Sequence, residues 1–345
     1  MENKMQTKRE TVLTGISTTG MPHLGNYVGA IRPAIDASRE GSVDAYYFLA
    51  DFHALIKCQD PKIVHESTQQ IAATWLALGL DIKNVAFYRQ SDIPEITQLC
   101  WYLSCIAPKG LMNRAHAYKD AVQKNKDSRE DNDFGIGMGL FSYPVLMAAD
   151  ILMFNGTKVP VGKDQIQHIE MARDIAQRFN YLYGEHFSLP EAVVDQKVPL
   201  LQGLDGRKMS KSYGNTIPLF LPENQLKKHL NKIKTNLQEP GEPKDPETST
   251  IFQIWSAFAT KKQTEDMRKE FENGIAWGEA KKILFDLVNQ ELKGPRDEYT
   301  KLMESPDYIE SILREGAAKA RAYSTPFLEK INKAVGLYSL AKKDD

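Results

Sequence analysis

The first half of the chain alternates short apolar runs with amphipathic helical patterns. The apolar runs end near Leu13, Asp51 and Ser91, and helical periodicity fills 65–79 and 94–107. Each apolar run has the length of a buried strand, and strands that alternate with helices are typical of a parallel sheet covered on both faces. The sequence therefore predicts an α/β fold built on a doubly wound parallel sheet.

Such a sheet binds its ligands at the carboxyl ends of its strands. Polar or glycine-rich segments follow each predicted strand, at 15–26, at Asp51 to His53 and at Arg89 to Ser91. We therefore expect these three segments to converge at one edge of the sheet.

The middle of the chain predicts an insertion around 108–140. Its stretch 119–139 is charged and then glycine-rich, which favours an exposed, mobile loop over a folded element. An apolar helix follows at 139–155, then a short strand at 158–161 and a long helix from about Asp164.

Beyond residue 217 the periodicity is helical, apart from a proline-rich, charged loop at 239–248. We therefore expect a catalytic domain at 1–216, which includes the insertion, and a helical C-terminal domain at 217–345.

Composition excludes several classes of protein. The 345 residues carry a net charge of −1, so a nucleic-acid partner would have to be bound by local basic patches. The three cysteines have no Cys-x-x-Cys spacing, which disfavours a disulfide framework or a zinc site. The polar N-terminus lacks the apolar segment of a signal peptide, and no apolar run is long enough to span a membrane. We expect a cytoplasmic protein that binds no membrane.

Two loops have the composition of phosphate-binding elements. In "TGISTTGMPHLGNYVGAI" a predicted strand leads through glycines into a helix, whose first backbone N–H groups can bind an anion; an ordinary tight turn explains this stretch equally well. In "DGRKMSKSYGN" two lysines stand three apart among serines and glycines, where they can neutralise a polyphosphate; a solvated basic loop is the alternative.

The string Lys-Met-Ser-Lys-Ser at 208–212 resembles the second signature of class I aminoacyl-tRNA synthetases, and His23 to Asn26 resembles their first signature. The stretches "YPVLMAADIL", "VPVGKDQIQHIEMARDIAQRFN" and "GRKMSKSYGNTI" resemble the bacterial tryptophanyl-tRNA synthetases, and the resemblance extends from about residue 11 to 337. It implies a Rossmann-like catalytic domain and a helical domain that binds the tRNA anticodon.

The resemblance implies an ATP site made of three loops. The matching positions are Ser17, Thr18, Thr19, His23, Gly25 and Asn26 in the first loop, Gly162, Lys163 and Asp164 in the second, Val198 through its backbone, and Lys208, Met209, Ser210, Lys211 and Ser212 in the lysine loop. Of these, Lys208, Ser210 and Lys211 are implied to be catalytic. No protein ligand for a metal is implied, although Mg²⁺ would accompany the ATP.

The resemblance also implies a tryptophan pocket. The indole N–H is only a donor, so a selective pocket needs a buried acceptor, and the matching residue is Asp150; a structural carboxylate is the alternative. The other matching positions are His53, Tyr143, Met147, Val159 and Val161 around the indole, each of which also fits a simple core position, and Gln165 at the polar end of the amino acid.

The sequence departs from the family pattern at two places. Ser17, Thr18 and Thr19 replace the usual Gln-Pro-Ser/Thr, and Leu13 replaces a phenylalanine. A further lysine of the insertion is expected to reach the phosphates, and both Lys119 and Lys124 qualify.

The resemblance implies that the tryptophan carboxylate attacks the α-phosphorus of ATP and that tryptophan then passes to tRNA(Trp). Basic stretches at 227–234 and 281–282, with Lys319 and Arg321, are candidate tRNA contacts or solvated helix faces. A homodimer is implied as well. Three alternatives stay open at this point: a tyrosine-specific synthetase, a non-catalytic regulatory paralogue, and a small-molecule adenylyltransferase.

Overall fold

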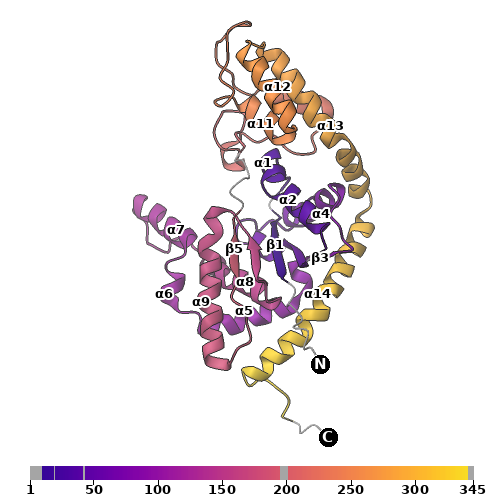
Figure 1. The fold of residues 1–345 in the computed structure, drawn as a ribbon. Helices are drawn as coiled ribbons and strands as arrows, with labels where there is room; N and C mark the ends of the chain where they lie inside the picture. Colours follow the sequence, from indigo (N-terminus) through magenta and orange to yellow (C-terminus); the bar gives the residue numbers. More distant parts are fainter. Residues whose placement is uncertain (1–9, 19, 42, 195–200, 341–345) are drawn as a thin grey trace, which may run out of the picture.

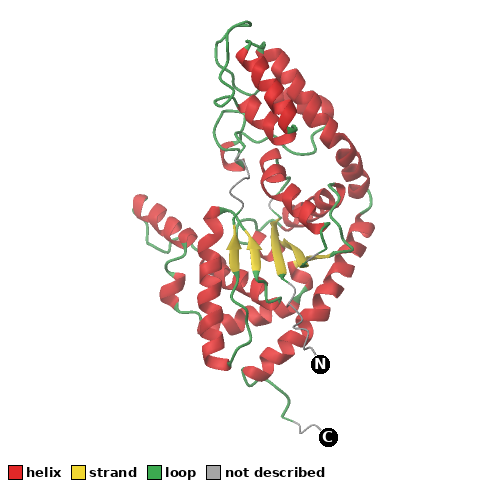
Figure 2. Ribbon diagram, in the orientation of Figure 1, coloured by secondary structure: helices red, strands yellow, loops and turns green. Residues whose placement is uncertain are grey.

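A computed structural model describes residues 10–18, 20–41, 43–194 and 201–340. Five parallel strands form one sheet in the order β3-β2-β1-β4-β5, which confirms the predicted α/β architecture. In Figure 1 the sheet lies at the centre, and Figure 2 shows helices on both sides of it. The strands are β1 (Thr11–Ser17), β2 (Asp44–Ala50), β3 (Val85–Arg89), β4 (Lys158–Pro160) and β5 (Glu191–Val193).

The helices of the first two hundred residues surround this sheet. A π-helical turn η1 (Tyr27–Ile31) joins α1 to α2, and the 3₁₀ turns η2 (Gln90–Asp92) and η3 (Lys163–Gln165) precede α5 and α9. The helices are α1 (Leu24–Asn26), α2 (Arg32–Ser38), α3 (Asp51–Ala54), α4 (Pro61–Ala77), α5 (Pro94–Ile106), α6 (Lys109–Met112), α7 (His116–Asp127), α8 (Met138–Met153) and α9 (Ile166–Tyr183).

Alternation along the strands divides the core into two layers. In β2, Tyr47 and Leu49 face one layer, whereas Phe48 faces the other. The first layer includes residues of η1, α2 and α4, and the second includes residues of α5, α8 and α9. Since side chains of a strand point alternately to opposite faces, both faces of the sheet are covered by helices, as in a doubly wound fold.

The helices after residue 217 form an extension that continues into the sheet. They are α10 (Glu223–Asn231), α11 (Thr250–Phe258), α12 (Lys261–Glu272), α13 (Trp277–Met303) and α14 (Pro306–Ala334). In Figure 1, α11, α12 and one end of α13 lie away from the sheet, whereas α14 returns along it. The structure thus places the last helix against the strands, which the sequence periodicity did not anticipate. The boundary at 216/217 stays a prediction.

Close packing attaches α14 to the edge strand β3. A Cβ atom added to Gly316 of α14 would lie 1.7 Å from the carbonyl oxygen of Phe87 in β3. On either side of this glycine, Leu313 belongs to the first core layer and Ala317 to the second. The helix therefore covers the edge of the sheet, which would otherwise expose unpaired backbone groups.

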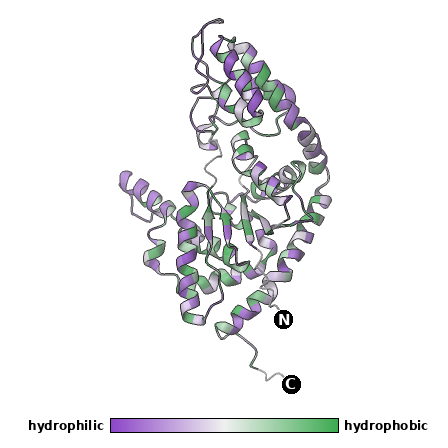
Figure 3. Cartoon of the chain, viewed as in Figure 1, coloured by the Kyte–Doolittle hydropathy of each residue, from purple (hydrophilic) through white to green (hydrophobic). Residues whose placement is uncertain are grey.

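The prediction of a mobile loop at 119–139 is wrong for its first part, because α7 runs to Asp127. None of the residues of α7 is buried, and Figure 3 colours most of this helix hydrophilic. Contacts outside the helix hold it: Tyr118 donates to Asp133 at 2.7 Å and packs edge-on against Phe141. The charged residues are thus the solvated face of a helix.

Candidate active site

The first loop starts at the carboxyl end of β1 and leads into α1. Ser17, the last residue of the strand, is exposed, whereas Thr18 is 2 % exposed. The Thr18 hydroxyl has no hydrogen-bond partner among the described residues. Thr19 lies outside the described residues. The strand, turn and helix therefore follow one another as predicted, and a buried hydroxyl lies at the turn.

His23 and Asn26 cap the helix that follows. The Nδ1 atom of His23 accepts the backbone N–H of Asn26 at 3.2 Å, and the side-chain oxygen of Asn26 accepts the backbone N–H of His23 at 3.1 Å. Burial lowers the pKa of His23 to about 4, with a further contribution from the charge of Lys211. The imidazole is therefore neutral at pH 7, and its proton is on Nε2 because Nδ1 is an acceptor.

The lysine loop is a compact turn organised by Asn215. The buried amide of Asn215 accepts the backbone N–H of Ser210 at 2.8 Å and donates to Asp205 at 2.7 Å and to the carbonyl of Lys208 at 3.1 Å. The Met209 side chain belongs to the core, and its backbone N–H donates to the Leu201 carbonyl. Lys208 and Ser212 are exposed.

The two loops are in direct contact. The ammonium of Lys211 donates to the carbonyl oxygen of Gly20 at 3.0 Å. A second hydrogen bond joins α1 to the segment after the lysine loop: the backbone N–H of Leu24 donates to the Ile217 carbonyl at 3.0 Å. Gly25 lies at the contact, where an added Cβ would be 3.1 Å from the His23 ring and 3.6 Å from the Met209 Cβ. The fold thus joins the two stretches that resemble the class I signatures.

The second loop follows β4, beside the first. β4 pairs with β1 in parallel, so the segment after Pro160 lies at the same edge as the end of β1. Gly162 and Lys163 are exposed there. The side chain of Asp164 and the whole of Val198 lie outside what the structure describes.

Asp150 of α8 is a buried carboxylate with two side-chain partners. It is 1 % exposed; its Oδ2 lies 2.9 Å from Nε2 of His53, and its Oδ1 accepts from Nε2 of Gln90 at 2.7 Å. Burial raises the pKa of Asp150, and the hydrogen bonds from His53 and Gln90 oppose that rise. The carboxylate is therefore an acceptor held in a fixed orientation.

A second group of polar side chains lies next to Asp150. The hydroxyl of Tyr143 lies 2.6 Å from Nε2 of His168, and Nδ1 of His168 lies 2.9 Å from Oε1 of Gln165. The rings of His53 and Tyr143 pack edge to face, with 6.3 Å between their centroids. Met147 is partly buried, Val159 is buried in β4, and Val161 follows that strand.

The predicted convergence at the strand ends is confirmed for β2 and β3. Asp51 accepts from the backbone N–H of Ser91 at 3.1 Å and from its hydroxyl at 2.5 Å. Arg89 is bound elsewhere: it pairs with Asp92 and with Glu310 of α14, both at 2.8 Å.

Sequence reasoning missed Gln90 and His168 as members of this site. A polar residue directly after a buried strand was the signal for Gln90, since Arg89 to Ser91 was already expected at the edge. His168 stands three residues after Gln165, a spacing that places both on one face of a helix. No pattern in the sequence singled out Asn215 within the lysine loop.

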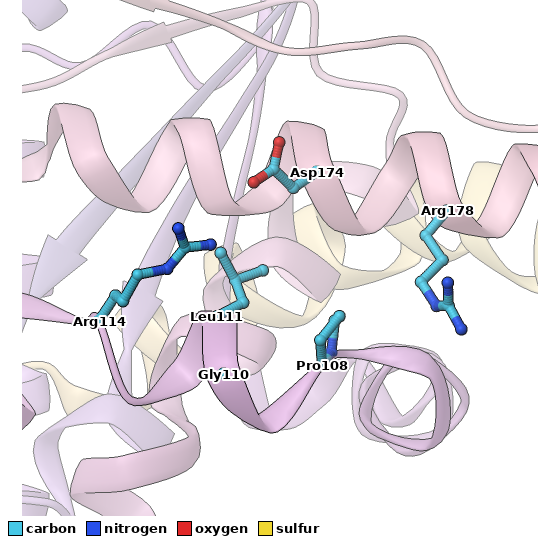
Figure 4. Close-up of a pocket in the computed structure, with 6 residues that line it drawn as sticks. All are labelled: Pro108, Gly110, Leu111, Arg114, Asp174 and Arg178. Carbon is cyan, nitrogen blue, oxygen red and sulfur yellow. The ribbon is translucent and has the colours of Figure 1, made fainter.

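A surface cavity of about 500 Å³ lies between α6 and α9, and it is lined by Pro108, Gly110, Leu111, Arg114, Asp174 and Arg178. In Figure 4, Arg114 from the turn after α6 and Asp174 from α9 lie on facing sides of it. None of the predicted site residues lines this cavity. The contact between the two loops and the buried Asp150 therefore define the site better than the cavity does.

No cluster of three or more metal-ligating side chains occurs in the described ranges. No helix within them is long and apolar enough to cross a membrane.

Comparison with known proteins gives one family. The family model for class I tRNA synthetases (W and Y) matches residues 5–293. The chain is 60% identical to a tryptophan–tRNA ligase of Pseudomonas aeruginosa, over 95% of this chain and 74% of that protein. It is 57% identical to the tryptophan–tRNA ligase of Neisseria meningitidis, over 96% of this chain and 99% of that protein.

A solved structure agrees with these sequences. The tryptophanyl-tRNA synthetase of Campylobacter jejuni, in complex with ADP and tryptophan, matches with a TM-score of 0.87 and 42% identity over 95% of this chain and 100% of that chain. This chain therefore belongs to the class I tRNA synthetases of the tryptophan and tyrosine family.

Proposed function

We propose that the chain is a tryptophan–tRNA ligase, which activates L-tryptophan with ATP and transfers it to tRNA(Trp). The observation that carries the proposal is the sequence identity of 57–60% to two bacterial tryptophan–tRNA ligases over 95–96% of this chain. The structural match to a synthetase in complex with ADP and tryptophan supports binding of tryptophan and of an adenine nucleotide.

The tryptophan site is proposed around Asp150. Its carboxyl group is buried, and it can accept the indole N–H on a lone pair that His53 and Gln90 leave free. The indole ring would pack among Tyr143, Met147, Val159 and Val161, and Gln165 would bind the polar end of the amino acid. A pocket built on such a hydrogen bond discriminates by roughly 10⁴–10⁵ against an analogue without the donor.

The ATP site is proposed where the first and lysine loops meet. Neutral His23 can donate from Nε2, and the Thr18 hydroxyl has no partner among the described residues that would compete for a ligand. Lys211, Lys208 and Ser210 would bind the phosphates. The remaining positions implied by the resemblance, in the first, second and lysine loops, complete the proposed site.

Activation needs no general base, because the tryptophan carboxylate is already ionised at neutral pH. That carboxylate attacks the α-phosphorus, tryptophanyl-adenylate forms, and pyrophosphate leaves. The chain contributes positioning and positive charge, from Lys208 and Lys211 and from backbone N–H groups. Mg²⁺ bound to the phosphates would add charge stabilisation. Phosphate and water oxygens would hold it, since the described residues form no acidic cluster.

The second step transfers tryptophan to the terminal ribose of tRNA(Trp). We propose that the helical part, 217–345, binds the anticodon region. The support is a local group of basic side chains: Lys227 and Lys228 are exposed on α10, and the ammonium of Lys281 of α13 donates to the carbonyl of Asn231, the last residue of α10, at 2.9 Å. The ammonium of Lys319, by contrast, donates a hydrogen bond to the carbonyl of Ile82 in the segment before β3. It is therefore used for a contact within the protein and is a weaker candidate for tRNA binding.

A homodimer in the cytoplasm completes the proposal. Two exposed aromatic side chains are candidates for the dimer contact: Trp101 of α5 is 68 % exposed, and Tyr181 near the end of α9 is 86 % exposed. Light scattering of the purified protein tests the assembly, and a monomer at micromolar concentration would contradict it. The cytoplasm is proposed because that is where tRNA is charged.

Tryptophan-dependent exchange between ATP and pyrophosphate tests substrate and chemistry together. We expect exchange with tryptophan, charging of tRNA(Trp), and neither with tyrosine. Charging by tyrosine alone would favour a tyrosine-specific synthetase. Tryptophan binding without exchange would favour a regulatory paralogue, and exchange without tRNA charging would favour an adenylyltransferase.

A further inference from the structure

Gln90 is a fully buried amide that connects three elements of the site. It lies at the start of η2, directly after β3, and none of its surface is exposed. Its Nε2 donates to Oδ1 of Asp150 on α8 at 2.7 Å. Its Oε1 accepts the backbone N–H of Phe52 on α3 at 3.2 Å, an N–H that is shared with Asp51. One side chain thus links the ends of two strands to the helix that carries the carboxylate.

The orientation of this amide follows from its partners. A backbone N–H can only donate, so the oxygen of Gln90 must face Phe52 and the nitrogen must face Asp150. Oδ1 of Asp150 is then an acceptor. On the other side of the carboxylate, Nε2 of His53 lies 2.9 Å from Oδ2. The plane of the carboxylate is therefore set from both sides.

Few other residues would serve at position 90. A methionine would fill a similar volume without the donor, and a glutamate would put a second carboxyl group where the donor stands. In a fully buried position two facing carboxylates cannot both be ionised without a large cost. An amide is the side chain that supplies one donor and one acceptor with no charge.

We propose that Gln90 is a positioning residue for substrate specificity, which holds Asp150 as an oriented acceptor for the aromatic N–H of the amino acid substrate. The inference rests on the proposed function, because it assumes that Asp150 receives the indole N–H. Gln90 itself acts through Asp150 and has no contact with the reacting atoms. Its loss should therefore reduce recognition of the N–H and leave the chemistry of the phosphates intact.

The test compares two substrates in Gln90→Met. One is tryptophan, and the other is the alanine derivative in which sulfur replaces the indole N–H, 3-benzothienylalanine. In pyrophosphate exchange, we expect KM for tryptophan to rise about 10- to 100-fold, the range typical of a lost hydrogen bond to a charged group. We expect kcat to change little, and KM for the sulfur analogue to stay within about threefold of its wild-type value.

Gln98→Met is the matched control. Gln98 also carries a hydrogen-bonded amide, which contacts Tyr102 and Asn332, but it is exposed on α5 and outside the site. This variant should leave both KM values unchanged. An equal loss for both substrates in Gln90→Met would mean that Gln90 is merely structural, and an unchanged KM for tryptophan would also overturn the proposal.

Gln90→Glu gives a second readout that does not depend on Gln90→Met being stable. A protonated glutamic acid can still donate to Asp150, whereas an ionised one repels it, so KM for tryptophan should rise with pH in this variant and not in the wild type. The neighbouring ionisable groups are Asp51 and His53 of α3, Tyr88 of β3 and Cys100 of α5. The same pH profile in both proteins would overturn the proposal.

The wild-type protein separates this inference from the proposed function. If the wild type exchanges pyrophosphate with tryptophan but binds the sulfur analogue equally well, the ligase function stands and the acceptor role of Asp150 and Gln90 is wrong. If the wild type shows no tryptophan-dependent exchange or binding, the proposed function fails, and this inference fails with it.

Discussion

The ammonium of Lys211 lies 3.0 Å from the carbonyl oxygen of Gly20 and donates a hydrogen bond to it across 191 positions of the chain. Gly20 adopts a φ of +81°, which residues with a side chain rarely adopt, so the direction of this carbonyl depends on glycine. Desolvation by the atoms around the ammonium lowers the pKa of Lys211. The bond therefore holds a positive charge beside the first loop, where phosphates are proposed to bind.

Replacing Lys211 with alanine should slow adenylate formation more than it weakens ATP binding. The lysine charge is needed most when negative charge develops on the phosphates, so we expect kcat for pyrophosphate exchange to fall about 100-fold or more. Lys62→Ala is the control, because Lys62 is an exposed lysine of α4 that pairs with Glu66 at 3.9 Å. A Lys211→Ala effect confined to the KM for ATP would contradict charge stabilisation.

His23 should make the folded protein sensitive to mild acid. Its pKa is lowered from 6.5 to about 4 by burial and by Lys211, so between those pH values the unfolded chain binds more protons than the folded one. The contribution of His23 to the free energy of unfolding is thus complete above about pH 6.5 and decreases as the pH falls to about 4. The slope is at most about 1.4 kcal/mol per pH unit.

Denaturant titrations at several pH values test this prediction in His23→Asn. Asparagine retains a side-chain acceptor for the helix N-terminus but does not titrate, so the slope between pH 6.5 and 4 should become shallower. His65→Asn, at an exposed histidine of α4, should keep the wild-type slope. Identical slopes in all three proteins would show that His23 does not cause the acid sensitivity.

The strand ends were predictable because their signals are local. The apolar run before Asp51 and the run before Ser91 are continuous, so each strand could be located from neighbouring residues. Parallel pairing of β2 with β3 then places both ends at one edge, and the bond from Ser91 to Asp51 follows from that. The family resemblance implied that the first loop and the lysine loop lie close together, and the hydrogen bond from Lys211 to Gly20 joins them.

What the sequence could not provide depends on contacts between distant segments. The path of α14 along β3 relies on Gly316, which has no side chain and packs against the backbone of Phe87. A glycine within a helical sequence pattern does not identify the residue that it will contact. One of the two partners of Asp150 could not be predicted for the same reason, because Gln90 is 60 positions away in the chain. The helix α7 was missed because its charged residues were interpreted as a loop, although lysine, glutamine and alanine are good helix formers.

Gly316→Ala should be strongly destabilising. The added methyl group would lie 1.7 Å from the Phe87 carbonyl oxygen, which belongs to the backbone of β3 and cannot rotate away. The helix would have to move off the strand, so we expect a loss of about 3 kcal/mol or more in the free energy of unfolding, at the upper end of single substitutions. Denaturant unfolding followed by circular dichroism measures this loss.

Gly278→Ala is its matched control. Gly278 lies in the first turn of α13, is exposed, and has nothing within 4 Å of an added Cβ. Alanine has a higher helix propensity than glycine, so this variant should be as stable as the wild type or more stable, by up to about 1 kcal/mol. Equal effects of the two substitutions would mean that α14 does not approach β3 as closely as the structure places it.

Tyr88 and Tyr47 offer opposite outcomes for the same substitution to phenylalanine. Both residues are buried, Tyr47 in β2 and Tyr88 in β3, but the Tyr88 hydroxyl has no hydrogen-bond partner among the described residues, whereas the Tyr47 hydroxyl donates to the carbonyl of Ala34 at 2.7 Å. A buried hydroxyl without a partner costs free energy, and a buried hydrogen bond contributes about 1 kcal/mol. Tyr88→Phe should therefore keep or raise the free energy of unfolding, and Tyr47→Phe should lower it by about 1 kcal/mol. A loss of more than that in Tyr88→Phe would reveal a partner for its hydroxyl, such as a buried water, between β3 and Asp150.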